Sequence, residues 1–131
     1  MTDVCSWTVQ KCDTGDIWLA PPGKAGLSFD DGPSLGSEQL ITYLSANDLS
    51  ATHFVIGSSI MYNPDIMKIM ADSGVHLGVH TFSHSIQTTK TDLEVLGDLG
   101  WTMQLIYEAT GKVPMYFRPP EGELSEGFHA H

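Results

Sequence analysis

The apolar residues of this chain form two kinds of pattern, and the two kinds alternate along the sequence. Short runs rich in β-branched and aromatic residues predict strands, and they lie at 25–29, 51–56, 75–79 and 113–117. Apolar residues at helical spacing predict helices, and these segments lie at 37–47, 63–74 and 91–110. The pattern therefore predicts a strand followed by a helix, three times over, with a fourth strand after the last helix.

Strands that alternate with helices at intervals of about 25 residues are typical of βαβ units, whose strands run parallel in one sheet. The predicted fold class is therefore α/β, with parallel strands and helices packed outside them. In such folds the functional groups collect beyond the carboxyl ends of the strands. Asp30, His80 and Arg118 each follow a predicted strand, so three separate segments bring polar groups to one edge of the sheet.

Two motifs at that edge carry the donor atoms of a metal site. Ser28-Phe29-Asp30-Asp31-Gly32-Pro33 presents two adjacent carboxylates, and His80-Thr81-Phe82-Ser83-His84 presents two imidazoles four residues apart. At that spacing both rings can reach one ion, and one Asp completes a two-His, one-Asp set with open positions. This set suits zinc, and also cobalt, iron, nickel or manganese. The second Asp is then free to act as a base toward a water on the ion.

Each motif also has a plainer structural interpretation. Asp-Gly-Pro is an ordinary turn signal, two histidines at this spacing occur by chance, and an arginine before two prolines is a common surface feature. A turn explains Gly32 and Pro33, but it does not explain two carboxylates directly after a strand. The combination of motifs therefore favours the metal site.

Composition sets limits on the class of protein. The chain has 131 residues, of which 41% are apolar, so one domain with a single packed core is expected. There are 6 Lys and Arg against 16 Asp and Glu, which gives a formal charge of -10. Because nucleic acids and anionic lipids need clustered cations, this balance argues against both as partners. No apolar run reaches the length of about 18 residues that a membrane span needs, so no transmembrane segment is predicted.

The two ends of the chain predict little regular structure. We expect residues 1–23 to form an irregular segment and 123–131 to form a polar tail. The first residues show no basic stretch followed by an apolar one, so no signal peptide is predicted in this chain. Cys5 and Cys12 can bridge each other, pair with residues outside this chain, or stay reduced.

Two other residues have ordinary structural interpretations. His53 lies inside an apolar run and is expected to be a partly buried histidine with its hydrogen bonds satisfied. Trp101 lies in the longest predicted helix and is expected to pack in the core.

The two motifs, followed by Arg118-Pro119-Pro120-Glu121-Gly122, resemble the first three motifs of the polysaccharide deacetylases, which form carbohydrate esterase family four. Gly100-Trp101-Thr102-Met103-Gln104 resembles the fungal chitin deacetylase branch of that family. The resemblance runs from about residue 24 to residue 122. It implies that 24–122 form the N-terminal portion of the family's distorted (β/α) barrel.

The resemblance also implies a role for each motif residue. Asp30 is then the catalytic base, Arg118 orients that base, and the backbone N–H of Glu121 helps to stabilise the oxyanion. The implied ligands of a divalent metal, usually zinc or cobalt, are Asp31, His80 and His84. The implied substrate is chitin or another N-acetylglucosamine polymer, which releases acetate. The implied location is outside the cell or in the cell wall.

The sequence departs from the family pattern in two ways. The family usually has Tyr after Pro-Pro, where this chain has Glu121, and a carboxylate beside a developing oxyanion is unfavourable unless it points away. The later family motifs, which brace the arginine and supply the catalytic acid, do not occur in this sequence. The strands present cannot close a barrel, and an unpaired edge strand favours self-association.

Three classes of function stay open on the sequence. The first is a metal-dependent chitin deacetylase. The second is a truncated homologue that binds metal or carbohydrate without efficient turnover, since a missing general acid typically costs about 10²–10⁴-fold in rate. The third is an α/β interaction module in which the motifs are coincidental, which three motifs in family order disfavour.

Overall fold

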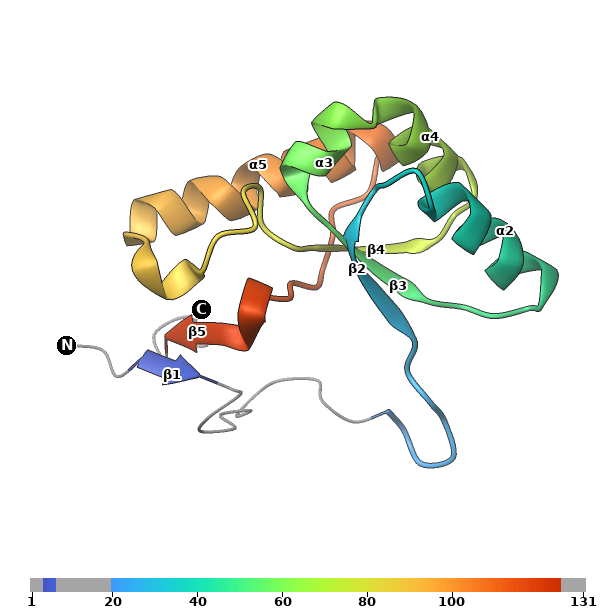
Figure 1. The fold of residues 1–131 in the computed structure, drawn as a ribbon, viewed down its shortest axis with the longest axis horizontal. Coiled ribbons are helices and arrows are strands. Elements are labelled where there is room, and N and C mark those ends of the chain that lie inside the picture. The colour runs from blue at the N-terminus through green and yellow to red at the C-terminus, as the bar shows by residue number, and fades with distance from the viewer. Residues whose placement is uncertain (1–3, 7–19, 126–131) are drawn as a thin grey trace.

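A computed structural model of the chain describes residues 4–6 and 20–125 (Figure 1). Strands β2, β3 and β4 form a parallel sheet in that order, and helices stand between them in the sequence, so the fold is α/β as predicted. The elements in chain order are β1 (Val4–Ser6), β2 (Ser28–Gly32), α2 (Ser37–Ala46), β3 (Thr52–Val55), α3 (Gly57–Tyr62), α4 (Pro64–Asp72), β4 (His76–Val79), η1 (Gln87–Thr89), α5 (Asp92–Thr110), η2 (Pro120–Gly122) and β5 (Glu123–Ser125).

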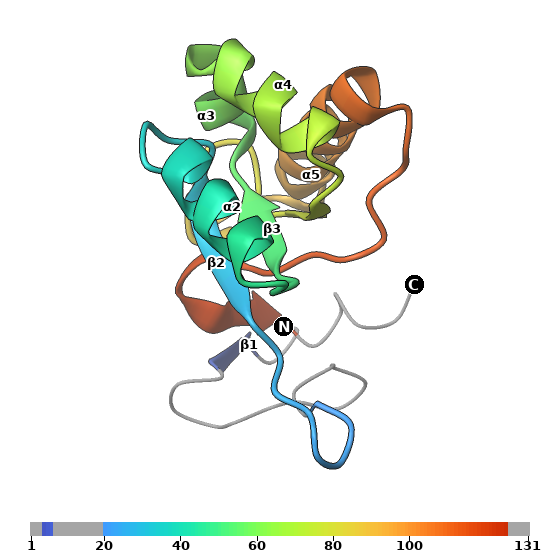
Figure 2. The ribbon, with the colours of Figure 1, turned by 90° about the vertical axis from the view of Figure 1, so that its right-hand side faces the viewer.

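The core lies between the sheet and its helices. Figures 1 and 2 both place the four helices α2 to α5 on one side of the sheet, and β1 and β5 on the other. The buried cluster between them consists of Ile41, Val55, Ile60, Met67, Met70, Leu77, Val79 and Ile106. Burying side chains of this size stabilises the fold by about 1.5–3 kcal/mol each. This packing fixes where the carboxyl ends of the strands lie.

The longest helix has a defined signal at each of its ends. Thr91 precedes α5 and accepts a hydrogen bond from the backbone of Glu94, whose side chain in turn accepts from the backbone of Thr91. This reciprocal capping box satisfies two of the free N–H groups at the helix start. Gly111 follows the helix with φ 70°, a left-handed conformation that suits glycine.

Helix α3 was not predicted, because its six residues carry no helical pattern of apolar positions. It begins at Gly57, whose backbone N–H donates to the carbonyl of Thr81. A Cβ at this position would lie 2.4 Å from the Phe82 ring and 2.6 Å from the Thr102 hydroxyl. The helix therefore starts where only a glycine lets the chain pass between these two side chains.

The predicted strand at 113–117 is wrong in extent. Within the described residues only Phe117 pairs with β4, as a single bridge to Val79. Pro114 has no N–H to contribute to a strand ladder, and it lies early in the segment. Two hydrogen bonds still hold the end of the segment to β4: Val79 donates to the carbonyl of Tyr116, and Arg118 donates to the carbonyl of Val79.

The chain ends contain more regular structure than the sequence predicted. Strand β1, inside the segment 1–23, pairs antiparallel with β5, which opens the segment 123–131. Cys12 lies outside the described residues, so the expectations about the two cysteines stay predictions. In the described part of the chain, β2 pairs with β3 alone, and self-association through its open edge also stays a prediction. No helix among the described residues is long and apolar enough to cross a membrane.

The expectation that Trp101 packs in the core is wrong, because its side chain is 67% exposed. Helix α5 turns Val95, Asp98, Thr102 and Ile106 toward the protein, a set at helical spacing. Trp101 falls outside that face. A tryptophan in an apolar helix is therefore not a reliable marker of the buried side.

His53 on β3 is only 4% exposed, which agrees with its apolar surroundings, and its ring stacks on Phe29 with centroids 5.5 Å apart. The expectation that its hydrogen bonds are satisfied is wrong for the part of the chain that the structure describes, where Nε2 is buried and has no partner. Burial lowers the pKa of His53 from its usual value of 6.5, because the charged ring would lose its hydration.

We predict that His53→Phe makes the protein less sensitive to acid. The unfolded chain takes up a proton on His53 near pH 6.5, whereas the folded protein resists that proton, so stability falls as the pH drops below about 6.5. The variant lacks this group and should lose less unfolding free energy between pH 7.5 and 5.5, as measured by urea unfolding with a chelator present. At pH 7.5 it should gain about 1 kcal/mol, because no unpaired nitrogen stays buried.

The control for this prediction is Ile106→Val, which removes one buried methyl group from α5 and no titrating group. It should keep the wild-type loss of stability between the two pH values. An equal loss in wild type and His53→Phe would show that His53 does not contribute to acid sensitivity.

Candidate metal centre

The two adjacent carboxylates lie at an irregularity in the sheet. Strand β2 pairs with β3 at Phe29 opposite His53 and at Gly32 opposite Val55, so β2 has one residue more than β3 between these pairs. Asp30 and Asp31 occupy this bulge, and Asp31 has a left-handed backbone with φ 66°. A bulge re-aims side chains that would otherwise alternate between the two faces of a sheet. This explains how neighbouring residues can serve one site.

The two histidines stand at the two ends of a short loop after β4. His80 is held to β3, because its backbone N–H donates to the carbonyl of Val55 at 2.9 Å. Thr81 is fully buried, and its hydroxyl accepts from the backbone N–H of His84 at 3.0 Å. Thr81 and His84 both have positive φ values, 65° and 54°. Such residues cost of order 1–3 kcal/mol each unless their surroundings hold them, and they concentrate at functional sites.

The hydrogen-bond partner of the His80 ring shows which of its two nitrogens carries the hydrogen. Its Nδ1 lies 2.7 Å from the backbone carbonyl of Arg118, which can only accept, so Nδ1 carries the hydrogen. In the neutral ring Nε2 then has a free lone pair. That atom lies 3.4 Å from Oδ1 of Asp31. Two electron-rich atoms that face each other at this distance are stabilised by a cation between them.

The distances fit one divalent ion. Nε2 of His84 lies 3.1 Å from the same Oδ1 of Asp31, and the donor atoms of all three residues lie within 4.8 Å of one another. Two ligands that are each about 2.1 Å from a tetrahedral ion lie about 3.4 Å apart. The side chain of His80 is 5% exposed, whereas that of Asp31 is 66% exposed. The site is therefore anchored on one side and open to solvent on the other.

The second carboxylate, Asp30, is held by Arg118. The guanidinium Nη1 lies 2.6 Å from Oδ1 of Asp30, a charge-assisted hydrogen bond between residues 88 positions apart. The guanidinium also lies over the Phe54 ring, 4.1 Å from its centroid. This stacking fixes the plane of the arginine on the sheet. Asp30 thus has a fixed partner, while Asp31 faces the histidines.

The structure places Glu121 at the turn after the two prolines. It lies in η2 with φ 58° and ψ 3°, and its side chain is exposed. The structure therefore brings together five of the six predicted site residues, namely Asp30, Asp31, His80, His84 and Arg118. The role of the Glu121 backbone in binding an oxyanion stays a prediction.

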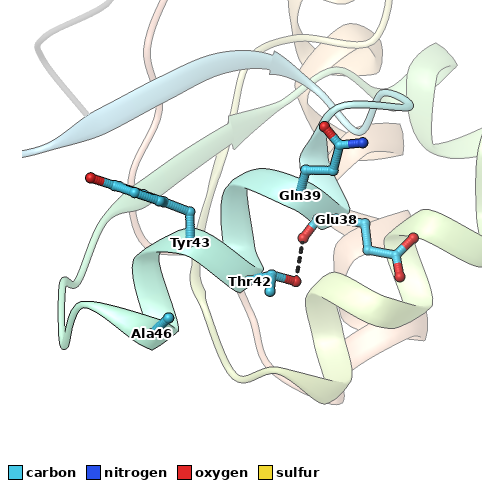
Figure 3. Close-up of a pocket in the computed structure, with 5 residues that line it drawn as sticks. All are labelled: Glu38, Gln39, Thr42, Tyr43 and Ala46. Atoms are coloured by element: carbon cyan, nitrogen blue, oxygen red, sulfur yellow. Dashed lines mark hydrogen bonds between the residues drawn. The ribbon is translucent and has the colours of Figure 1, made fainter.

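A shallow hollow elsewhere on the surface is a separate feature. It runs along α2 and is lined by Glu38, Gln39, Thr42, Tyr43 and Ala46, all of them exposed (Figure 3). The hydrogen bond drawn there runs from the Thr42 hydroxyl to the Glu38 carbonyl within the same helix. Side chains of one helix line this hollow, and it includes none of the motif residues.

Comparison with known proteins agrees with this geometry. The sequence profile of the family described as polysaccharide deacetylase matches residues 20–130. The chain belongs to the polysaccharide deacetylase family. Chitin deacetylase 3 of Cryptococcus neoformans var. neoformans serotype D is 43% identical to this chain, over 98% of the chain and 32% of that relative.

Two solved deacetylase-family structures share the fold. A family 4 carbohydrate esterase from Streptomyces lividans, in complex with acetate, has a TM-score of 0.74 at 35% identity and covers 81% of this chain and 55% of its own. The Bc1960 peptidoglycan N-acetylglucosamine deacetylase has a TM-score of 0.77 at 31% identity, with 82% and 51% covered. The polysaccharide deacetylase chain described here thus spans about a third of the length of its curated relative and about half of each solved structure.

Two residues that build this deacetylase-family site, Phe54 and Asp98, were missed in the sequence. Phe54 lies under Arg118, and nothing in the run 51–56 marked it as different from a core residue. Asp98 on α5 binds the loop that carries His84, through the backbone N–H of Ser83. A signal for Asp98 was present, because it is a charged residue at the same helical spacing as the apolar Val95 and Ile106.

We predict that His84→Ala abolishes high-affinity binding of a divalent metal. Loss of one of three ligands should raise the Kd for Zn²⁺ or Co²⁺ by more than about a hundredfold, since even the partners of metal ligands are worth 10–100-fold. Isothermal titration calorimetry at pH 7.5 measures this. His76→Ala removes an exposed histidine outside the site and should bind like wild type. Unchanged binding by His84→Ala would place the metal elsewhere.

Proposed function

We propose that the protein hydrolyses the N-acetyl groups of an N-acetylglucosamine polymer, with chitin as the first candidate, and that it needs a divalent metal, zinc first and cobalt second. The observation that carries this proposal is that two adjacent aspartates at one edge of the sheet have different partners. Asp31 faces two imidazoles at 3.1 and 3.4 Å, while Asp30 is bound to Arg118. The names of the relatives support the substrate class, since they include chitin deacetylase and peptidoglycan N-acetylglucosamine deacetylase.

In this proposal Asp31, His80 and His84 hold the metal. When bound there, the ion supplies Lewis-acid chemistry, which polarises the acetamide carbonyl and makes a water more acidic. The donor set of two imidazoles and one carboxylate suits this, because it leaves positions open for water and substrate. The exposed side of Asp31 faces the solvent from which the substrate comes.

Asp30 acts as the base in the same proposal. Its carboxylate takes a proton from the water whose oxygen forms a bond to the acetyl carbon. The C–N bond then breaks, that proton passes to the nitrogen, and the products are acetate and a free amine. Arg118 keeps Asp30 in one orientation, through the 2.6 Å hydrogen bond and the stack on Phe54. The backbone N–H of Glu121 would face the negative charge that develops on the carbonyl oxygen.

The proposed substrate also bears on partners and location. A polymer of N-acetylglucosamine is uncharged, so the formal charge of -10 does not oppose its binding, whereas it does oppose nucleic acid. A chitin deacetylase acts where its polymer is laid down, so the proposed location is the cell wall or the space outside the cell.

We predict that Asp30→Asn lowers the rate of acetate release from chitin oligomers by about 10²–10⁴-fold, the usual contribution of a positioned base. Its affinity for the metal should stay within about twofold of wild type, because Asp30 is not among the three facing donors. The rate is measured by coupled detection of acetate with Zn²⁺ or Co²⁺ added, and the affinity by calorimetry.

Asp31→Asn is the matched comparison, one residue along the chain. It should lose both metal affinity and activity, so the two variants separate the base from the ligand. If wild-type protein binds one metal per chain but releases no acetate, then the second candidate holds, a homologue that binds metal or carbohydrate without efficient turnover. Equal activity of wild type and Asp30→Asn would contradict the proposed base.

A further inference from the structure

Asp98 is a buried carboxylate that the proposed reaction does not use. It lies in the middle of α5 and is only 6% exposed. Burying a charge is costly unless hydrogen bonds and an opposite charge compensate. The groups that bind the buried Asp98 carboxylate therefore show which part of the chain it holds in place.

Among the described residues, the groups that donate to the Asp98 carboxylate come from one loop, 83–90. Oδ1 accepts from the backbone N–H of Ser83 at 3.0 Å. Oδ2 accepts from the Ser83 hydroxyl at 3.2 Å and from the Gln87 amide at 2.9 Å, and the Lys90 ammonium lies 3.3 Å away. Burial acts to raise the pKa of Asp98, but the hydrogen bonds from Gln87 and Ser83 and the Lys90 charge outweigh it, so the net pKa is lowered.

The loop that donates hydrogen bonds to Asp98 begins beside a proposed metal ligand. Ser83 directly precedes His84, and the His84 backbone is itself held on the other side by the Thr81 hydroxyl at 3.0 Å. Residues upstream of Ser83 are attached to the start of α3, since Ser58 donates to the carbonyl of Phe82. The peptide before His84 is therefore fixed between two elements, with α5 on one side and α3 on the other.

We propose that Asp98 is a positioning residue for the metal ligand His84. Its carboxylate fixes the Ser83 peptide and thereby keeps His84 in the left-handed conformation, φ 54°, in which its Nε2 faces Asp31. This inference rests on the proposed metal site, although it concerns a residue outside that site. An amide cannot replace the carboxylate in full, because Asp98 accepts hydrogen bonds on both oxygens and Asn has one acceptor oxygen and no charge to pair with Lys90.

Two substitutions that change the charge in opposite directions distinguish positioning of His84 from a direct effect of charge on metal binding. Asp98→Asn removes a negative charge and should raise the Kd for Zn²⁺ or Co²⁺ by roughly tenfold, the scale for residues that orient metal ligands. Lys90→Met removes a positive charge, so an effect of charge alone would strengthen metal binding. If Asp98 acts by holding the loop, Lys90→Met weakens binding as well, because the loop loses a donor to the same carboxylate. Stronger or unchanged binding by Lys90→Met overturns the inference.

A matched control and a metal-free readout complete the test. Ile106→Val loosens the buried face of the same helix and should leave the Kd unchanged. Amide hydrogen exchange on the metal-free protein should be at least about tenfold faster at Ser83 and His84 in Asp98→Asn, with no such change in Ile106→Val. Exchange at wild-type rates would show that Asp98 does not order the loop.

The outcomes of the two proposals can be told apart. If wild-type protein binds no metal, the proposed function fails, and the exchange rates still report whether Asp98 orders the His84 loop. If wild type binds metal and Asp98→Asn binds it equally well, the proposed function stands and the positioning role fails. If Asp98→Asn does not fold, the direction of the change in Lys90→Met decides.

Discussion

The attachment of one short segment to the edge strand β4 holds the candidate site together. Arg118 donates its backbone N–H to Val79 and accepts from His80 Nδ1 on its carbonyl, while its side chain binds Asp30. A single residue thus fixes the tautomer of one histidine and the position of one carboxylate. Because these contacts join residues far apart in the chain, they exist only once the sheet has formed. The chemistry of the site therefore depends on a tertiary contact as much as on its motifs.

The backbone at the site is unfavourable locally and is held by its surroundings. Within the described residues, positive φ values outside glycine occur at Asp31, Asp48, Thr81, His84 and Glu121, and four of these five lie in the three motifs. Each such residue is disfavoured by sterics in an isolated chain. The bulge in β2, the Thr81 hydroxyl and the Asp98 carboxylate are the features that hold two of these segments. Rigid ligands reduce the reorganisation that metal binding would otherwise require.

Burying a polar side chain costs free energy, and two side chains of this protein meet that cost in opposite ways: one keeps its charge and the other stays neutral. Asp98 has enough donors to keep its charge inside the protein, and those in the described part of the chain come from the loop that carries a proposed ligand. His53 remains neutral and stacks on Phe29, and one of its nitrogens has no partner among the described residues. A satisfied network specifies one arrangement of its loop, whereas an unpaired group lowers stability without specifying anything. This difference makes Asp98 the residue with a functional role to test.

Local patterns in the sequence were enough to predict the fold class, most element positions and the donor atoms. Apolar periodicity and local end signals are short-range properties, so 37–47 and 91–110 are helical nearly as predicted, and Asp31, His80 and His84 lie together. The extent of the strand near Phe117, the start of α3 at Gly57 and the exposure of Trp101 became visible in the three-dimensional structure alone. The same holds for the stacking of Arg118 on Phe54 and for the hydrogen bonds from the loop 83–90 to Asp98. The physical reason is that these features depend on which side chains from distant segments share a space, and local pattern carries no information about that.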